Sequence, residues 1–200
     1  MRFFISALAA GCLLSCTNSD KSLVAGKTSI DNVRNLETQE LAKRGEYLVI
    51  VGGCDDCHSP KVMGPQGPEV DSARRLSGHP ANSTTPPVSG TPNKPGNWMN
   101  IAPDLTAWIG PWGISYTANL TPDTATGTGS WTAEEFINTI RSGKHLGMNN
   151  GRPLLPPMPW QNYRQMNDED LRSIYTFIHS LPPVNNKVPA PVPPDQVMAK

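Results

Sequence analysis

Five consecutive residues constrain this chain more than any other feature: Cys54, Asp55, Asp56, Cys57 and His58 form a Cys-x-x-Cys-His motif. Two cysteines at this spacing can bond to one edge of a porphyrin as thioethers, and the histidine that follows can then ligate the iron. The chain holds only four cysteines and four histidines in 200 residues, so a chance match is rare. The motif therefore predicts one covalent c-type haem, with His58 as the proximal iron ligand.

Two other interpretations of the paired cysteines remain open, half of a zinc site and a redox-active dithiol. Tetrahedral zinc normally takes a second pair of ligands, but the other histidines are scattered singly and no second Cys-x-x-Cys is present. A thioredoxin-like dithiol follows a strand within a βαβ unit. Residues 47–51 could form a strand, but no βαβ alternation follows them. The sequence favours haem over both.

The composition agrees with a loop-rich domain wrapped around a cofactor. The formal net charge is zero, so we expect no nucleic acid or anionic surface as a partner. The 21 prolines and 17 glycines favour long loops over regular sheet. A covalent haem would supply apolar surface that such a chain lacks by itself.

The N-terminus is predicted to be a lipoprotein signal peptide covering residues 1–15. A short positive region precedes the apolar residues 3–14, which are too few to span a bilayer. Leu13, Leu14, Ser15 and Cys16 then resemble a bacterial lipobox, which implies that Cys16 is lipidated; an ordinary cleaved signal is the alternative. We therefore expect an extracytoplasmic, periplasm-facing protein of the cell envelope, anchored to a membrane by lipid, with the choice of inner or outer membrane open.

Three further segments are predicted from composition. Residues 16–37 are polar and without apolar periodicity, so we expect a flexible tether. Residues 38–183 contain all the periodic segments and the haem motif, and we assign them to one domain. Residues 184–200 are rich in proline, which indicates an extended, polyproline-like tail. The simplest interpretation of that tail is a disordered end without a role.

Three helices are predicted within the domain, over residues 38–51, 133–142 and 168–180. In the first, Gly45 is a small residue at which another helix could approach closely. Thr132 and Glu135 form a capping box at the start of the second, which Gly143 is placed to end. The third has an apolar face at helical spacing and two prolines after its end; Asn167 can cap its start.

Met158 is the predicted sixth ligand of the iron. It lies between the second and third predicted helices, in the run Pro156, Pro157, Met158, Pro159. Flanking prolines restrict the loop, so that less entropy is lost when the thioether is presented to the iron. Met148, His145 or an open site are the alternatives.

The order of these elements resembles class I cytochrome c. Further motifs, such as Asn119-Leu-Thr-Pro-Asp123, Arg141-Ser-Gly143 and Pro157-Met-Pro-Trp160, resemble the single-haem modules of bacterial membrane-associated cytochromes, some of which serve dehydrogenases as electron-accepting subunits. The resemblance covers residues 40 to 183. It implies an all-α fold, a cytochrome c-like helical domain around one haem with long Pro/Gly-rich loops. Residues 59–116 depart from a minimal cytochrome c, and the sequence assigns them no role.

Haem propionates are anionic and need donors when partly buried. Arg141, Trp131 and Trp160 lie in segments that are expected to line the pocket, and each side chain carries N–H donors. A solvated arginine and packing tryptophans are the alternative. His79 and His179 are expected to be surface residues without a ligand role.

The chemistry that these residues support is electron transfer rather than catalysis. The sequence contains no nucleotide-binding glycine loop or catalytic triad, so we expect a non-enzymatic carrier whose partners are redox proteins, a dehydrogenase or a terminal oxidase. Asp55 and Asp56 are expected to be solvated, with a part in a docking patch as the alternative. The rival functions, a haem peroxidase using His145 as base or a ligand sensor, require an open iron site.

Overall fold

The computed structural model describes residues 19–84 and 88–197, with side chains from residue 31 onward. It divides into two compact units, Met1–Glu37 and Thr38–Lys200. The signal peptide and Cys16 lie outside the described residues. Within the described residues, no helix is both long and apolar enough to pass through a membrane.

Helix α1 covers Ser19–Val51 and so crosses the boundary between the two units. Residues 19–37, for which a flexible tether is predicted, are helical instead. This stretch contains no proline and a single glycine, so local propensity permits a helix even though the side chains of residues 31–40 are all exposed. The sequence pattern missed this helix because its residues show no apolar periodicity, only the absence of helix breakers.

The other two predicted helices are found with the predicted bounds. Helix α3 covers Ala133–Ser142, with the capping box of Thr132 and Glu135 in place and Gly143 in a left-handed conformation at φ 68°. Helix α5 covers Asp168–Ser180 and is capped by the Asn167 side chain. The short helices α2, Cys54–His58, and α4, Trp160–Tyr163, complete the α-helical elements of the described residues.

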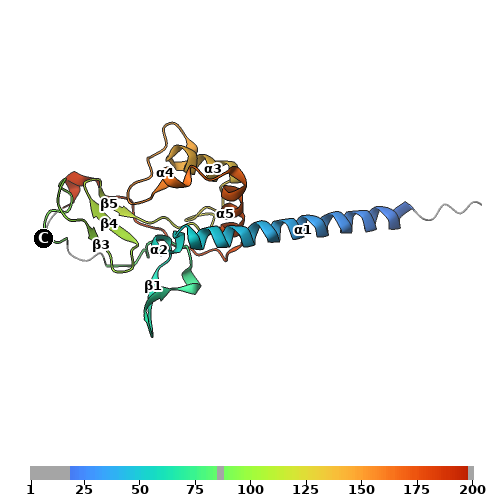
Figure 1. Ribbon diagram of the computed structural model, residues 1–200, viewed down its shortest axis with the longest axis horizontal. Helices are drawn as coiled ribbons and strands as arrows, with labels where there is room; N and C mark the ends of the chain where they lie inside the picture. Colours follow the sequence, from blue (N-terminus) through green and yellow to red (C-terminus); the bar gives the residue numbers. More distant parts are fainter. Residues whose placement is uncertain (1–18, 85–87, 198–200) are drawn as a thin grey trace, which may run out of the picture. The chain divides into compact units, whose positions relative to one another are not determined.

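The core of the second unit forms where α1, α3 and α5 meet. A Cβ on Gly45 would lie 1.9 Å from the carbonyl oxygen of Ser173, so α5 approaches α1 closely at this glycine, as predicted. Helices α3 and α5 pack side by side (Figure 1). The buried cluster consists of Leu48, Val49, Leu76, Phe136, Ile137, Ile140, Leu171, Ile174, Phe177 and Ile178.

The all-α class is too narrow, because residues 59–116 form two small antiparallel sheets. The first pairs β1, Lys61–Gly64, with β2, Gly67–Val70. The second has the order β3-β4-β5 and comprises Asn100–Ile101, Ala107–Gly110 and Gly113–Tyr116. Short strands between glycine turns carry too little alternation to be recognised from the sequence.

Strand β5 and the residues that follow it form hydrogen bonds with two parts of the candidate site described below. The Ser115 hydroxyl in β5 donates a 2.7 Å hydrogen bond to the carbonyl of Pro156. Pro156 belongs to residues 156–159, which carry Met158 and which we name the methionine loop. Immediately after β5, the carbonyl of Ala118 accepts a hydrogen bond from His58. The segment without an assigned role therefore supports both sides of the candidate site.

The proline-rich residues 184–197 belong to the same compact unit as residues 38–183, whereas the sequence predicts a separate tail. Val192 pairs with Ile114 of β5 through two backbone hydrogen bonds of 2.8 and 3.0 Å, and the C-terminal segment runs back along the sheet (Figure 1). Three-residue turns of 3₁₀ helix occur at Ser72–Arg74, His145–Gly147 and Pro194–Gln196.

Candidate haem site

One cavity of about 690 Å³ joins the residues that the sequence singles out. Cys54, Cys57 and His58 reach it from α2, and Met158 reaches it from the loop before α4. Roughly one hundred residues of sequence separate the two groups. The fold therefore brings the predicted attachment cysteines, the predicted proximal ligand and the predicted sixth ligand to a single pocket.

His58 is held in one tautomer and one orientation. Its Nδ1 lies 2.8 Å from the carbonyl oxygen of Ala118. Because a carbonyl can only accept, Nδ1 carries the hydrogen and Nε2 keeps its lone pair. Burial lowers the pKa of His58 below its usual value, which keeps the ring neutral. A neutral imidazole with a fixed second nitrogen is the arrangement of a metal-ligating histidine.

Both cysteine thiols of the motif stay protonated and are not reactive thiolates. Burial raises the pKa of Cys54 to about 11 and also raises the pKa of Cys57. A redox-active dithiol requires the opposite shift. Within the part of the chain that the structure describes, no group of three or more His, Cys, Asp or Glu side chains could hold a metal ion. Neither the dithiol nor the zinc interpretation gains support.

The cavity separates the three candidates for the sixth ligand. Met158 lines it and is half-buried, packed against the core cluster. Met148 is 45% exposed and is not among the lining residues. His145 does line the cavity, and its ring makes an edge contact with that of Trp131 at a centroid distance of 5.1 Å. The geometry keeps Met158 and His145 as candidates and removes Met148.

The three predicted propionate donors have different positions. Trp131 lines the cavity. Arg141 does not: its guanidinium donates to the carbonyl of Arg164 and to the Asp168 carboxylate, which ties α3 to the start of α5. Trp160 also lies outside the cavity lining, and its ring packs against Gly143. The acidic residues in the first turn of α5 were the sequence feature that could have indicated an ion-pair partner for Arg141 outside the cavity.

The structure adds lining residues that the sequence did not indicate. Arg152 and Lys187 bring positive charge to the cavity. The Thr117 hydroxyl also lies among the lining residues, and its oxygen is buried without a hydrogen-bond partner in the described part of the chain. Tyr163 lines the cavity and donates a 2.6 Å hydrogen bond to the carbonyl of Gly52, just before the haem motif.

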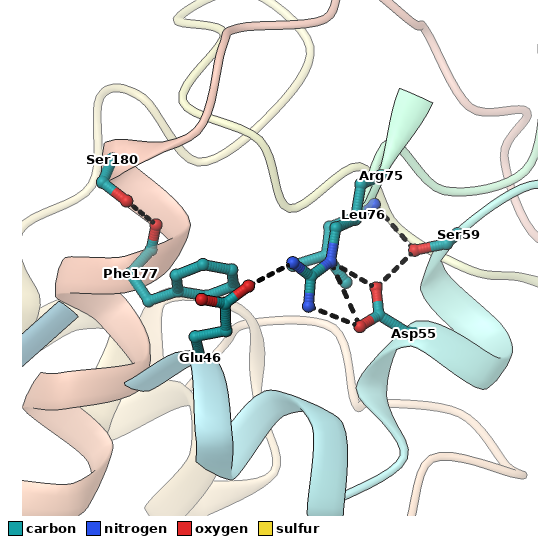
Figure 2. Close-up of polar contacts among 7 residues, drawn as sticks. All are labelled: Glu46, Asp55, Ser59, Arg75, Leu76, Phe177 and Ser180. Atoms are coloured by element: carbon teal, nitrogen blue, oxygen red, sulfur yellow. Dashed lines mark hydrogen bonds and ion pairs between the residues drawn. The ribbon is translucent and has the colours of Figure 1, made fainter. Parts of the chain in front are cut away.

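Behind the haem motif, Arg75 connects three parts of the fold (Figure 2). Its guanidinium forms a forked contact with Asp55, including an Nη2–Oδ2 distance of 2.8 Å, and reaches Glu46 of α1 at 2.7 Å. The guanidinium also lies 5.0 Å from the ring centroid of Phe177 in α5, a cation–π contact. Asp55 is therefore an internal ion-pair partner with 15% of its side chain exposed, and its prediction as a solvated aspartate is wrong; Asp56 is exposed.

Two neighbouring residues, Ser59 and Leu76, connect the contacts of Arg75 to the haem motif. Ser59 is fully buried; its hydroxyl donates to Asp55 and accepts from the Leu76 amide, each at 2.8 Å. Leu76 is also fully buried, with φ at 58°. A leucine in the left-handed region costs about 1–3 kcal/mol and persists where its surroundings fix it. The amide of Gly78 then donates a 2.7 Å hydrogen bond to the carbonyl of His58. We name residues 46, 55, 59, 75 and 76 the Arg75 cluster.

His79 is not a surface residue as predicted, since only 2% of it is exposed. Its Nδ1 lies 2.7 Å from the Thr106 hydroxyl, and its ring packs on Tyr116. His179 is half-buried and stacks on Tyr175 at 4.0 Å. Neither lines the cavity. Both are packing residues, and no apolar periodicity around His79 in the sequence indicates its burial.

The residues present fit a covalent haem. The same cavity presents two neutral thiols, an oriented neutral imidazole, a thioether and an orphaned buried hydroxyl. The two thiols would hold a haem through thioether bonds, and the imidazole and the methionine thioether would ligate its iron. Such a site, carried by three packed helices with the motif on α2, is typical of c-type cytochromes.

Comparison with known proteins narrows that class. No family profile matches the chain. It is 29% identical to the gluconate 2-dehydrogenase cytochrome c subunit of Pantoea cypripedii over 165 residues, 82% of this chain and 29% of that subunit. It is 28% identical to the cytochrome c subunit of the alcohol dehydrogenase (quinone) of Gluconobacter oxydans, over 76% of this chain and 24% of that subunit. The chain resembles cytochrome c subunits of dehydrogenases.

A shorter match concerns the fructose dehydrogenase cytochrome subunit of Gluconobacter japonicus, 37% identical over 34% of this chain and 13% of that subunit. The chain spans less than a third of the length of each of these three relatives. The similarity therefore concerns one part of each relative and not the whole of any of them.

Proposed function

We propose that this chain is a single-haem electron carrier in which His58 and Met158 ligate the iron. The observation that carries the proposal is the cavity shared by Cys54, Cys57, His58 and Met158. Bound haem supplies a one-electron couple between ferric and ferrous iron. Two protein ligands leave no position for a substrate, which suits electron transfer and not catalysis.

The residues of the chain have distinct parts in this function. Cys54 and Cys57 fix the cofactor, and the carbonyl of Ala118 orients His58 through Nδ1. The apolar residues of α3 and α5 that line the cavity, such as Phe136, Ile140 and Ile174, exclude water from it. A dry, apolar site disfavours the extra positive charge of ferric iron, and thioether ligation acts in the same direction. Both raise the reduction potential.

We propose a dehydrogenase as the redox partner. The relatives named above are cytochrome subunits of dehydrogenases, and this chain matches one segment of each. A chain with one haem module could receive electrons from such an enzyme and pass them onward. Electron-transfer partners of this kind associate through small surfaces and exchange rapidly.

The function is tested by the absorption spectrum of residues 17–200, exported with a c-haem maturation system. We expect haem that stays with the polypeptide on denaturation, a low-spin spectrum in both oxidation states, and a methionine-to-ferric charge-transfer band. These follow from thioether bonds at Cys54 and Cys57 and from axial ligands at residues 58 and 158. A high-spin spectrum would contradict the electron-carrier proposal and favour the peroxidase or sensor alternatives, whereas absence of haem would return attention to thiol or zinc chemistry.

We further propose that the chain is anchored by lipid on Cys16 at the periplasmic side of the cell envelope. The support is the lipobox-like run of residues 13–16 after an apolar segment. Replacing Cys16 by serine is expected to abolish acyl labelling and to move the protein from the membrane fraction to the soluble periplasmic fraction. Cys12→Ser is the matched control and is expected to keep both properties. A Cys16→Ser variant that stays acylated and membrane-bound contradicts the anchor.

A further inference from the structure

The charged side chains that line the cavity are all of one sign. Among the described residues that line the cavity, Arg152 is the one arginine and Lys187 is the one lysine. These lining residues include no aspartate or glutamate. Neither cation forms an ion pair within the described part of the chain. Both residues are exposed as a whole, so they belong to the open rim of the cavity and not to its apolar interior.

We propose that Arg152 and Lys187 form the binding site for the two propionate carboxylates of the haem, and that residues 187–191 form one wall of the haem site. This inference rests on the proposed function, because it assumes that haem occupies the cavity. Carboxylates that enter a partly dry site need cationic or hydrogen-bonding partners. Two unpaired cations at the rim of an otherwise apolar cavity meet that need.

A neutral donor lines the same cavity as the two cations. The Thr117 hydroxyl lines the cavity, and its oxygen is buried without a partner among the described residues. A buried hydroxyl left unpaired is unfavourable, so its presence indicates a partner that the protein part of the site does not supply. A carboxylate oxygen is an acceptor for this hydroxyl.

Lys187 is placed by a firmly attached backbone and not by a loose tail. The side chain of its neighbour Asn186 accepts from the Ala81 amide at 2.9 Å and donates to the carbonyls of Ser77 and His79 at 2.7 and 2.9 Å. The backbone N–H of Asn186 also donates a 3.0 Å hydrogen bond to the Thr126 hydroxyl. Beyond Lys187, residues 188–191 line the cavity as well.

The other end of this wall is attached too. Val192 pairs with Ile114 of β5, and before Asn186 the carbonyl of Val184 accepts from the Asn119 side chain at 2.8 Å. Attachment on both sides of Lys187 fixes the position of its backbone beside the cavity. The proline-rich composition of residues 189–194 lowers the entropy lost in holding such an extended segment.

The test measures the midpoint potential of the haem in the full chain by optical redox titration. Lys187→Gln and Arg152→Gln are each expected to lower the potential, because loss of a nearby cation favours ferric over ferrous iron. The double variant is expected to show a larger downward shift. Lys187→Arg and Arg152→Lys retain the charge and are expected to stay close to the wild-type potential. The propionate bending bands in the resonance Raman spectrum are expected to shift in the glutamine variants only.

Two variants outside the cavity serve as controls. Lys94→Gln removes an exposed lysine that does not line the cavity, and Arg172→Gln removes an arginine paired with Glu134 on the surface. Each removes one positive charge and is expected to leave the potential and the propionate bands unchanged. Because Arg152 and Lys187 are exposed and unpaired, their glutamine variants are expected to fold normally.

The outcomes separate this inference from the proposed function. If the glutamine variants keep a low-spin spectrum, the wild-type potential and unchanged propionate bands, the assignment of Arg152 and Lys187 is wrong while the electron carrier stands. If the controls shift the potential as much as the cavity variants do, the effect is general electrostatics and the assignment is again wrong. If the wild-type chain takes up no covalent haem, the proposed function itself fails, and this inference fails with it.

Discussion

Replacing Met158 by alanine is expected to convert a closed, low-spin haem protein into one that binds external ligands. The variant keeps Cys54, Cys57 and His58, so the haem stays attached, but the thioether on the cavity side of the methionine loop is lost. We expect the methionine-to-ferric charge-transfer band to disappear. We also expect carbon monoxide to bind the reduced variant readily and the reduction potential to fall, since thioether ligation favours ferrous iron. Absorption spectroscopy with carbon monoxide titration measures these changes.

Met148→Ala is the matched control, because Met148 is exposed and does not line the cavity. It is expected to leave the spectrum and the ligand affinity unchanged. If wild type binds carbon monoxide as readily as Met158→Ala does, Met158 is not the ligand and electron transfer loses its main support. His145 would then be the remaining candidate from the cavity, either as ligand or as the base of a haem catalyst.

Replacing Arg75 by alanine is expected to lower the free energy of unfolding of the haem-loaded protein by about 2–3 kcal/mol. The change leaves the Asp55 carboxylate, 15% exposed, without its ion-pair partner. It also removes the link to Glu46 and the cation–π contact with Phe177 (Figure 2). Chemical denaturation followed by circular dichroism measures the loss. Arg75→Lys is expected to be intermediate, since an ammonium cannot reproduce the forked contact of the guanidinium.

The control for the Arg75 cluster is Arg172→Ala. Arg172 pairs with Glu134 at 3.1 Å, but both side chains are largely exposed, at 44% and 66%. Such surface pairs contribute about 0–1 kcal/mol, so this variant is expected to unfold close to wild type. Equal losses for Arg75→Ala and Arg172→Ala would show that the Arg75 cluster has no special part in holding the haem motif.

The features that the sequence predicted well are local ones. The haem motif is five adjacent residues, and helices α3 and α5 are bounded by caps within a few residues of their ends. Short stretches of chain are enough to show helix capping and apolar periodicity at 3.6 residues. The same holds for a glycine at which two helices approach each other. Iron ligation by His58 and Met158 stays a prediction, and the structure shows that both residues line one cavity.

The features that the sequence did not predict depend on contacts between distant segments. Lys187 and Arg152 reach the cavity, Arg75 reaches Asp55, and Arg141 reaches Asp168 because of how the chain folds back. A side chain such as Arg141 or Arg152 looks the same in sequence whether it points to solvent, to a carboxylate or to a cofactor. Nothing in the composition of the proline-rich end indicates that Val192 pairs with Ile114 of β5.

The sequence by itself determined the chemistry that this protein can perform, because thioether attachment and iron ligation require particular residue types at fixed local spacing. Only the tertiary structure decided which polar residues surround that chemistry. Charge partners, the orientation of His58 by Ala118 and the approach of residues 187–191 to the cavity arise from long-range packing. The physical reason is that attachment is a property of neighbouring residues, whereas the environment of a bound group is a property of the surfaces that the whole chain brings together.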